Sequence, residues 1–194
     1  PLKADQAASS KFTAPLVDTP KTVQVITEEV LQQTGATSLQ EALKATPGIT
    51  FGNSEGGNPT GDQAFIRGMD AQASTFVDGM RDIAAGSREV FNLEAIEVIK
   101  GADSAYAGRG GAGGSINLAT KKAKNENFIA GDVGLGTDKY LRGTVDINRK
   151  INDTTAFRLN AMGHSADVPG RNGPDNKRWG IAPTVTFGMG TATE

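Results

Sequence analysis

The sequence has no cysteine and a single histidine, His164, among its 194 residues. Disulfides and thiol chemistry are therefore excluded, and a zinc site of the usual nitrogen and sulfur type has too few ligands. Twenty basic residues oppose 22 acidic ones, so no general attraction for nucleic acid is expected. No apolar run approaches the ~20 residues of a membrane-spanning helix. Glycine, by contrast, is abundant: 14 of the 25 glycines fall between positions 48 and 114.

The first part of the chain predicts a small mixed α/β arrangement. Residues 22–26 have the composition of a short strand, Thr27 is a suitable helix cap and Gly35 a suitable helix end. Ser38 and Glu41 have the spacing of a capping box for a second helix. The apolar faces of these helices need a sheet to cover them.

Short strands joined by glycine-rich loops are predicted next. Asp78 and Gly79, which lie between residues 76–77 and 80–81, form a strong signal for a type I′ hairpin turn. This composition favours a compact domain with much exposed loop surface. The predicted strands are 49–51, 64–66, 74–77, 96–99 and 115–120.

Beyond residue 128 the hydrophobic pattern acquires a period of two over four segments of about ten residues. Each segment has an apolar face and a polar face. The connections are expected at 137–138, at 149–153 and in a long polar loop, 164–176, where His164 would be solvated. The segments are 129–135, 141–148, 157–161 and 179–187.

This alternation is typical of an outer-membrane β-barrel, but a soluble antiparallel sheet alternates as well. Periodicity alone leaves both open. The polar face, which includes Arg142, Asp146, Arg158 and Asn160, suits a polar lumen. Four strands cannot close a barrel, so a barrel would be represented here by a part of itself.

Two motifs resemble catalytic signatures without the context that these require. Residues 108–113 match GxGxxG, but an alternating strand pattern follows where a dinucleotide site needs a helix. Residues 52–56 match GxSxG, but no helix can follow Ser54, and His164 is the only histidine that could act as its base. A close backbone approach explains the glycines better, and no catalytic residue is predicted.

Taken together, several stretches resemble the plug of TonB-dependent outer-membrane receptors for ferric siderophores. The resemblance covers about residues 15–122, and residues 128–187 are similar to the first barrel strands. The sequence of residues 92–118 is most similar to the catecholate branch of the family. Ala102 and residues 106–108 depart from the commoner pattern of the family. The stretches are 18–26, 38–43, 46–49, 65–68, 77–81, 93–101 and 107–118.

The resemblance implies an α+β plug domain, a small mixed sheet with short helices, followed by the first about four antiparallel strands of a transmembrane β-barrel. The expected domains are an extended leader (1–14), the plug (15–122) and the first barrel strands (123–194). The implied location is the outer membrane of a Gram-negative cell, with the plug inside the barrel lumen. Neither a TonB box nor a signal peptide is recognisable in residues 1–20, and both are expected to precede Pro1 or to have been removed.

The implied activity is import of a ferric siderophore, driven by TonB, which pulls on the N-terminal segment and rearranges the plug. Outer-membrane lipid is the other implied partner, and nucleic acid is not one. No cofactor and no protein ligand to iron are expected, because the metal arrives already chelated. A small glycine-rich domain with modest apolar contacts is a suitable element to unfold locally.

The resemblance also assigns roles to individual residues. Arg81 and Arg88 are attractive ligand contacts because a ferric tris-catecholate is anionic, although exposed arginines can simply solvate a loop. Arg67 and Lys100 match plug positions that pair with barrel carboxylates; local pairs with Asp70 or Glu97 are the alternative. The expected ligand contacts in the apical loops are Asn53, Glu55, Asn58, Gln72, Arg81 and Arg88.

Other functions stay open on the sequence. A receptor of the same architecture could take cobalamin, haem or a carbohydrate. A soluble glycine-rich binding module and a nucleotide-dependent enzyme using residues 108–113 are the alternatives from other classes.

Overall fold

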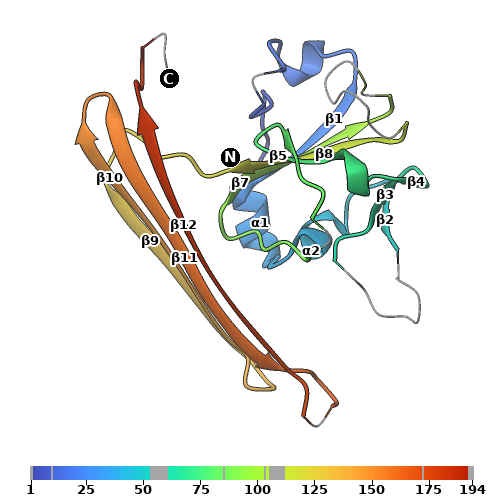
Figure 1. The fold of residues 1–194 in the computed structure, drawn as a ribbon, viewed down its shortest axis with the longest axis vertical. Coiled ribbons are helices and arrows are strands. Elements are labelled where there is room, and N and C mark those ends of the chain that lie inside the picture. Colours follow the sequence, from blue (N-terminus) through green and yellow to red (C-terminus); the bar gives the residue numbers. More distant parts are fainter. Residues whose placement is uncertain are drawn as a thin grey trace. The chain divides into compact units, whose positions relative to one another are not determined.

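The computed structural model describes residues 2–9, 11–52, 61–84, 86–102, 104, 112–171 and 173–191. The chain forms two compact units, Pro1–Thr120 and Lys121–Glu194 (Figure 1). Within the described ranges, no helix is long and apolar enough to cross a membrane.

The first unit has short helices whose ends are set by local sequence. Helix α1 (Glu28–Thr34) begins where the Thr27 hydroxyl accepts from the Val30 amide at 3.4 Å, and it ends at Gly35 in the left-handed conformation. Helix α2 (Leu39–Leu43) begins at a complete capping box between Ser38 and Glu41. These caps confirm the predicted boundaries, because they satisfy amide groups that a helix end leaves unpaired.

Two sheets complete this unit. The larger has the order β1-β7-β8-β5-β6, with β5 parallel to β8 and the other pairs antiparallel, and the smaller has the order β2-β3-β4. This mixed sheet with short helices is the predicted fold of the plug. The remaining elements of the unit are η1 (Leu16–Asp18), β1 (Thr22–Thr27), β2 (Ile49–Phe51), β3 (Ala64–Ile66), β4 (Met69–Asp70), η3 (Gln72–Ser74), β5 (Thr75–Val77), β6 (Met80–Arg81), β7 (Leu93–Lys100) and β8 (Gly114–Thr120).

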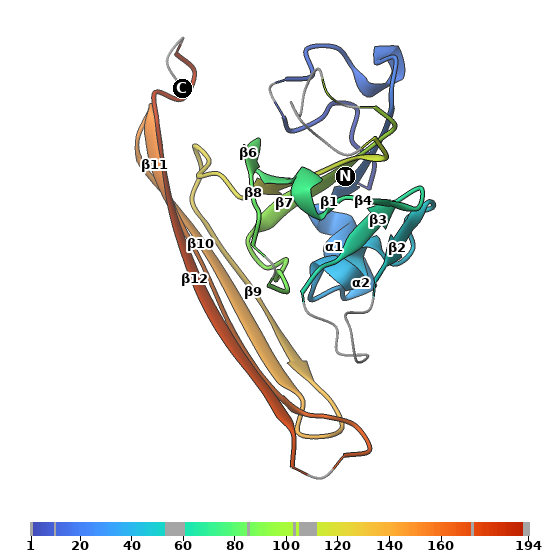
Figure 2. The same cartoon turned by 45° about the vertical axis from the view of Figure 1, so that its right-hand side comes forward.

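The hydrophobic core lies between the helices and one face of the larger sheet. In Figures 1 and 2, α1 and α2 lie on the same side of this sheet. Alternate residues of β7 and β8 face them, since side chains along a strand alternate between its two faces. The central members of the core are Leu31, Leu39, Leu43, Ile96, Val98, Ile116 and Leu118.

Two hairpin turns of the first unit have positive φ at both of their central residues. Asp78 (φ 49°) and Gly79 (φ 79°) connect β5 and β6, which confirms the predicted type I′ turn. A second turn of the same sign at Arg67 (φ 52°) and Gly68 (φ 79°) connects β3 and β4. It holds Arg67, one of the predicted plug-locking residues, at the tip of a hairpin.

The second unit is one antiparallel sheet of four long strands, in the order β12-β11-β10-β9 (Figure 2). The match between the four predicted segments and these strands confirms the period-two interpretation. The strands are β9 (Phe128–Leu135), β10 (Leu141–Asn152), β11 (Thr155–Asp167) and β12 (Asp175–Phe187).

Two of the expected connections in this sheet were too long. Strand β10 continues to Asn152 and β11 begins at Thr155, so the 149–153 connection is shorter than predicted. His164 lies in β11 opposite Arg178, and the prediction of a solvated loop residue was wrong. Polar composition misled this prediction, because a strand with one polar face accepts such residues at every second position.

The sheet has its apolar side chains exposed and several polar ones buried, which is the reverse of a soluble sheet packed on its own core. Asp146, Asn148, Arg158 and Asn160 are buried on the polar face. The opposite face exposes the large apolar side chains Ile129, Val133, Leu135, Leu141, Trp179, Ile181, Val185 and Phe187.

Candidate functional site

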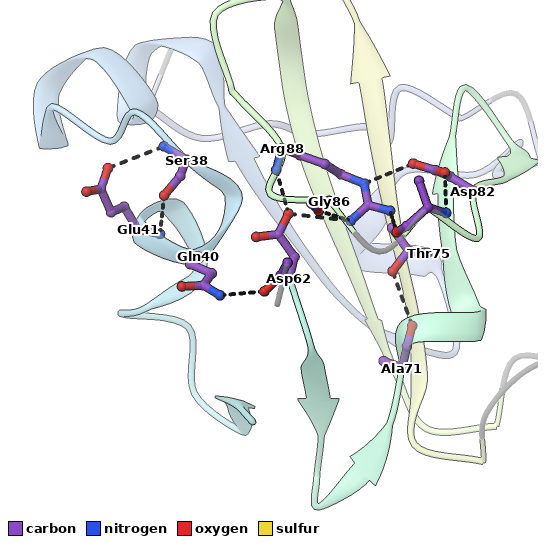
Figure 3. A network of polar contacts seen from close by, with 11 residues as sticks. Ser38, Gln40, Glu41, Asp62, Ala71, Thr75, Asp82, Gly86 and Arg88 are labelled. Carbon is purple, nitrogen blue, oxygen red and sulfur yellow. Dashed lines mark hydrogen bonds and ion pairs between the residues drawn. The ribbon is translucent and has the colours of Figure 1, made fainter. Parts of the chain in front are cut away.

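Arg88, a predicted ligand contact, lies between two carboxylates of the plug (Figure 3). Its Nε donates to Asp82 Oδ2 at 2.9 Å, and its Nη1 lies 3.4 Å from Asp62 Oδ2. The Arg88 backbone amide donates to the same Asp62 oxygen at 2.8 Å, and Nη2 donates to the Ala84 carbonyl at 2.8 Å. The guanidinium therefore connects Asp82 and Ala84 to Asp62, which lies two residues before β3.

The two carboxylates are in different environments. Burial raises the pKa of Asp62 above its usual value, and the hydrogen bonds and charge of Arg88 only partly oppose this effect. The pKa of Asp82 is lowered, first by the hydrogen bond from the Ala84 amide and then by Arg88. The Asp82 side of the cluster therefore keeps its negative charge to lower pH than the Asp62 side.

The other predicted ligand contacts lie in different places. Gln72 is the first residue of η3, and its backbone amide donates to Asp70 Oδ1 at 2.7 Å. Arg81 ends β6, with its guanidinium 5.4 Å from the centre of the Phe76 ring. Asn53, Glu55 and Asn58 lie outside the described residues. The assignment of all six residues to ligand binding stays a prediction.

Arg67 and Lys100, the predicted locking residues, lie close together. A Cβ atom built on Gly101 would be 3.7 Å from Arg67 Nη1, so the guanidinium lies beside the residue that follows Lys100. The pKa of Lys100 is lowered, mainly by burial and also by the charge of Arg67. Lys100 Nζ donates to Gln24 Oε1 at 3.2 Å.

The alternative of local pairs for these two cations is not what the structure has. Asp70 accepts the Gln72 amide, and Glu97 accepts donors from the leader and from Asn117. Within the described part of the chain, no ion pair joins Arg67 to Asp70 or Lys100 to Glu97. Among the described residues, these two cations therefore do not have Asp70 and Glu97 as ion-pair partners, and their role in locking the plug stays a prediction.

Glu97 is a fully buried carboxylate on the sheet face opposite the hydrophobic core. Its Oε1 accepts from the Ala8 and Ser9 amides, and its Oε2 accepts from Asn117 Nδ2 at 2.8 Å. Asn117 Oδ1 in turn accepts from the Gly79 amide at 3.0 Å. One carboxylate thus connects the leader to β8 and, through Asn117, to the β5–β6 turn.

The linker after the first unit is bound to the polar face of the four-stranded sheet. Arg158 donates to Asp146 through Nε at 2.8 Å and through Nη2 at 2.6 Å, and Lys121 Nζ reaches Asp146 Oδ2 at 3.1 Å. Arg158 Nη1 also donates to the Lys122 carbonyl at 2.9 Å. Asn148 exchanges hydrogen bonds with the backbone of Lys124 at 2.9 and 2.7 Å.

Sequence reasoning missed the partners in these networks. The signals were a carboxylate and an amide between apolar neighbours in the middle of strands β7 and β8, and the basic run 121–124 ahead of the strand that carries Asp146. Such polar groups inside strands need partners when they are buried. Nothing local identifies which partners, because the contacts join residues 12 to 89 positions apart.

The catalytic-looking motifs acquire no catalytic context. A strand, β8, follows residues 108–113, where a dinucleotide site needs a helix, and Ser54 lies outside the described residues. A Cβ atom on Gly113 would lie 2.3 Å from the Ile66 carbonyl oxygen, which is the close backbone approach expected for this run. Among the described residues, no cluster of three or more His, Asp or Glu side chains could hold a metal ion.

Comparison with known proteins identifies the first unit. The family described as TonB-dependent Receptor Plug Domain matches residues 15–115, just over half of the chain. The chain belongs to this plug family. Residues 15–115 span elements of the first unit from η1 to the start of β8.

Individual relatives match both units. The probable TonB-dependent siderophore receptor PiuA of Acinetobacter baumannii is 48% identical over 193 residues, 99% of this chain and 26% of the relative. The catecholate siderophore receptor Fiu of Escherichia coli K12 is 44% identical over 189 residues, 96% of this chain and 25% of the relative. The chain therefore spans about a quarter of the length of these relatives.

Solved structures agree with the sequence comparison. The crystal structure of PiuA superposes with a TM-score of 0.92 at 48% identity, covering 98% of this chain and 27% of that one. The closed form of the E. coli ferric-catecholate import receptor Fiu gives 0.91 at 43% identity, covering 97% and 27%. The plug fold followed by four antiparallel strands is thus the architecture of the corresponding part of these receptors, and the barrel is not closed by these strands.

Proposed function

We propose that this chain is the plug and the first four barrel strands of an outer-membrane receptor that imports a ferric siderophore. The observation that carries the proposal is the 44–48% identity to PiuA and Fiu across both units. The protein is then a transport receptor rather than an enzyme. The same relatives favour a siderophore over cobalamin, haem or a carbohydrate as cargo.

The ligand that we propose is a ferric catecholate. This class follows from Fiu, whose structure carries the name ferric-catecholate import receptor. The iron enters as a chelate, and the protein contributes donors to the chelate rather than ligands to the metal. Arg81 and the apical residues predicted with it remain the proposed contacts.

The four strands suit a barrel wall in the outer membrane. The exposed apolar row that includes Ile129, Trp179 and Phe187 would face lipid, and the polar face with Asp146 and Arg158 would face the lumen. A plug in that lumen would be held by Arg67 and Lys100, for which barrel carboxylates are the proposed partners.

Energy for import would come from TonB acting on the N-terminal segment. The described leader is bound to β7 by the two amides that donate to Glu97, so a pull on it acts directly on the central sheet of the plug. Segments of a domain that have few apolar contacts open at the lowest free-energy cost. Local opening of the plug, with the linker still bound to the strands by Asp146, would then admit the chelate.

Growth under iron limitation tests this function. A strain that lacks its own ferric-catecholate receptors is complemented with the full-length receptor, and iron(III) complexed with 2,3-dihydroxybenzoate is the sole iron source. Growth that requires both the receptor and a functional TonB supports the proposal.

Two controls make the result specific. Iron(III) citrate supplied to the same strains shows whether the effect is general, and a receptor with residues 15–115 deleted shows whether the plug is needed for gated uptake. Receptor-independent growth on the catecholate, or equal growth with and without TonB, would contradict the proposed function.

A further inference from the structure

Arg88 uses all three nitrogens of its guanidinium inside the plug. Nε donates to Asp82, Nη1 reaches Asp62 and the Gly86 carbonyl, and Nη2 donates to the Ala84 carbonyl. The Arg88 side chain is only 14% exposed. We call Asp62, Asp82 and Arg88 the Arg88 clamp (Figure 3). A direct contact between this guanidinium and a ligand would have to replace hydrogen bonds that the clamp already makes.

The clamp is attached to the start of helix α2. The Leu39 amide donates to the Arg88 carbonyl at 2.9 Å, and Gln40 Nε2 donates to the Gly61 carbonyl at 3.0 Å. The Arg88 amide in turn donates to Asp62 Oδ2 at 2.8 Å. Leu39 is itself a member of the hydrophobic core. Both segments that carry the clamp are therefore bonded to a helix whose position the core determines.

The other end of the clamp adjoins Arg81, a proposed ligand contact. Asp82 follows Arg81 in the chain, and its backbone amide donates to the Thr75 carbonyl at 2.9 Å. The side chain of Asp82 accepts the Ala84 amide at 2.9 Å through Oδ1 and Arg88 Nε at 2.9 Å through Oδ2. Loss of Arg88 or of the Asp82 carboxylate would thus remove restraints on the backbone directly after Arg81.

The charges of the clamp favour an internal role for Arg88. One guanidinium faces two carboxylates, so the clamp has a net charge of −1 when both carboxylates are ionised. The side chains of Asp62 and Asp82 are 1% and 27% exposed, so the compensating charges lie mostly away from solvent. An anionic chelate beside the clamp would meet a positive charge that its own partners already balance.

We propose that Asp62 and Asp82 are positioning residues for siderophore recognition, which hold Arg88 as a brace and thereby fix the place of Arg81 on the plug. The inference rests on the proposed function. It revises the role of Arg88 from a direct ligand contact to a residue that acts through the position of its neighbours. A binding group has to be held within about 0.5 Å of its productive position, which bonds from a core-attached segment can achieve.

Binding of iron(III) tris-catecholate to the full-length receptor in detergent tests the clamp, with Kd measured by calorimetry. Asp62→Ala and Asp82→Ala should each weaken binding about tenfold, because each removes an acceptor that holds Arg88. A direct contact between Arg88 and the chelate predicts the opposite sign. Removal of a carboxylate would then free the guanidinium, take away a negative charge and tighten binding to the trianionic chelate.

Two further variants separate position from charge. Asp62→Asn removes the charge of Asp62 but keeps an oxygen that can accept the Arg88 amide, so its Kd should lie between those of wild type and Asp62→Ala. Arg88→Gln combined with Asp62→Ala should bind no more weakly than the weaker of the two single variants, because both changes open the same brace.

A control variant distinguishes lost position from lost stability. Thr27→Ala removes the cap of α1, a different helix of the same unit, and lowers stability by a comparable local effect. Its Kd, measured on folded receptor well below the melting temperature, should stay within about twofold of wild type.

The outcomes distinguish this inference from the proposed function. Failure of the wild type to bind any tris-catecholate contradicts the function itself. Tight wild-type binding with an unchanged or tighter Kd in Asp62→Ala and Asp82→Ala overturns the clamp alone. An equal loss of affinity in Thr27→Ala also overturns it, because the effect would then follow the stability of the plug and not the position of Arg81.

Discussion

Asn117 and Glu97 are joined side chain to side chain inside the plug, with Asn117 Nδ2 donating to Glu97 Oε2 at 2.8 Å. The other carboxylate oxygen of Glu97 accepts the Ala8 and Ser9 amides from the leader. A single buried carboxylate therefore links the segment on which TonB is proposed to act to the centre of the sheet, across a sequence separation of 89 residues. The contact is polar and confined to one face of the sheet. It can therefore break without disturbing the apolar core on the other face.

The first prediction concerns this contact. Glu97→Gln places an amide NH₂ where one carboxylate oxygen accepted a donor, so either Asn117 or the leader loses its acceptor. We expect the free energy of unfolding of the plug to fall by about 1–3 kcal/mol, and trypsin to cleave after Lys11 faster in the full-length receptor. Glu94→Gln, on the same strand, is the matched control and should leave the cleavage rate near that of wild type. Unchanged cleavage after Lys11 in Glu97→Gln would show that the carboxylate does not hold the leader.

The second prediction concerns pH. The folded-state pKa of Asp82 lies below its unfolded value, so its ionised form stabilises the plug above that unfolded value. This contribution disappears as the pH falls through the lower, folded-state pKa. The melting temperature of the plug in Asp82→Asn should therefore lie below that of wild type at neutral pH and converge with it only below about pH 4. Differential scanning calorimetry of the detergent-solubilised receptor measures the difference.

Asp62 serves as an internal control, because its pKa shift is opposite in direction to that of Asp82. Its pKa is raised by burial, so ionisation between its unfolded and folded pKa values removes stability as the pH rises. The difference between wild type and Asp62→Asn should therefore change at pH values above those where Asp82 acts. Coincident transitions for the two variants would contradict the separate environments assigned to these carboxylates.

The third prediction concerns the linker network on the strands. Arg158 is 2% exposed and makes two hydrogen bonds to Asp146, so Arg158→Met leaves a buried carboxylate with Lys121 as its remaining cation. We expect a loss of about 3–5 kcal/mol for this single change. Removing both charges, in Arg158→Met with Asp146→Leu, should cost less than the sum of the single changes. Urea unfolding of the receptor, followed by the heat-modifiable mobility of the barrel, gives the four free energies of the cycle.

Additive losses in that cycle would show that Asp146 and Arg158 do not act as a pair. Arg149→Met, on the neighbouring strand β10, controls for the loss of an arginine from the sheet in general, because Arg149 lies at the exposed end of its strand and off the polar face. Its effect should stay within about 0.5 kcal/mol of wild type.

The sequence predicted those parts of the fold that depend on neighbouring residues. The Thr27 cap, the capping box of Ser38 and Glu41 and the turn at Asp78 and Gly79 each satisfy backbone groups within a few positions, so the local sequence is sufficient. Strands β9 to β12 were predicted from the alternation of apolar and polar residues, which is also a property of the local sequence.

What could not be predicted is which distant polar groups meet. Arg88 is a plausible ligand contact by sequence, but only the fold brings Asp62 and Asp82 to its two sides. His164 was placed in a loop because polar neighbours suggest one, whereas its pairing with Arg142 and Arg178 depends on the register of three strands. Register is set by whole strands, so a local composition cannot reveal it.

The last prediction concerns the backbone at the start of β8. A Cβ atom on Gly114 would lie 2.0 Å from the Ile99 carbonyl oxygen, and the φ of this residue is +136°, where other residues are strained. Since both obstacles are backbone features, no side-chain rotation relieves them, and Gly114→Ala should cost about 3 kcal/mol or more.

Gly86→Ala is the matched control for Gly114→Ala, since a Cβ atom there meets nothing within 4 Å. It should leave stability unchanged or raise it slightly by restricting the unfolded chain. The melting temperature of the plug transition in the full-length receptor measures both variants. The apical loops keep their sequence in Gly114→Ala, so any folded fraction should bind iron(III) tris-catecholate with the wild-type Kd. A wild-type melting temperature for Gly114→Ala would contradict the close approach of β8 to Ile99.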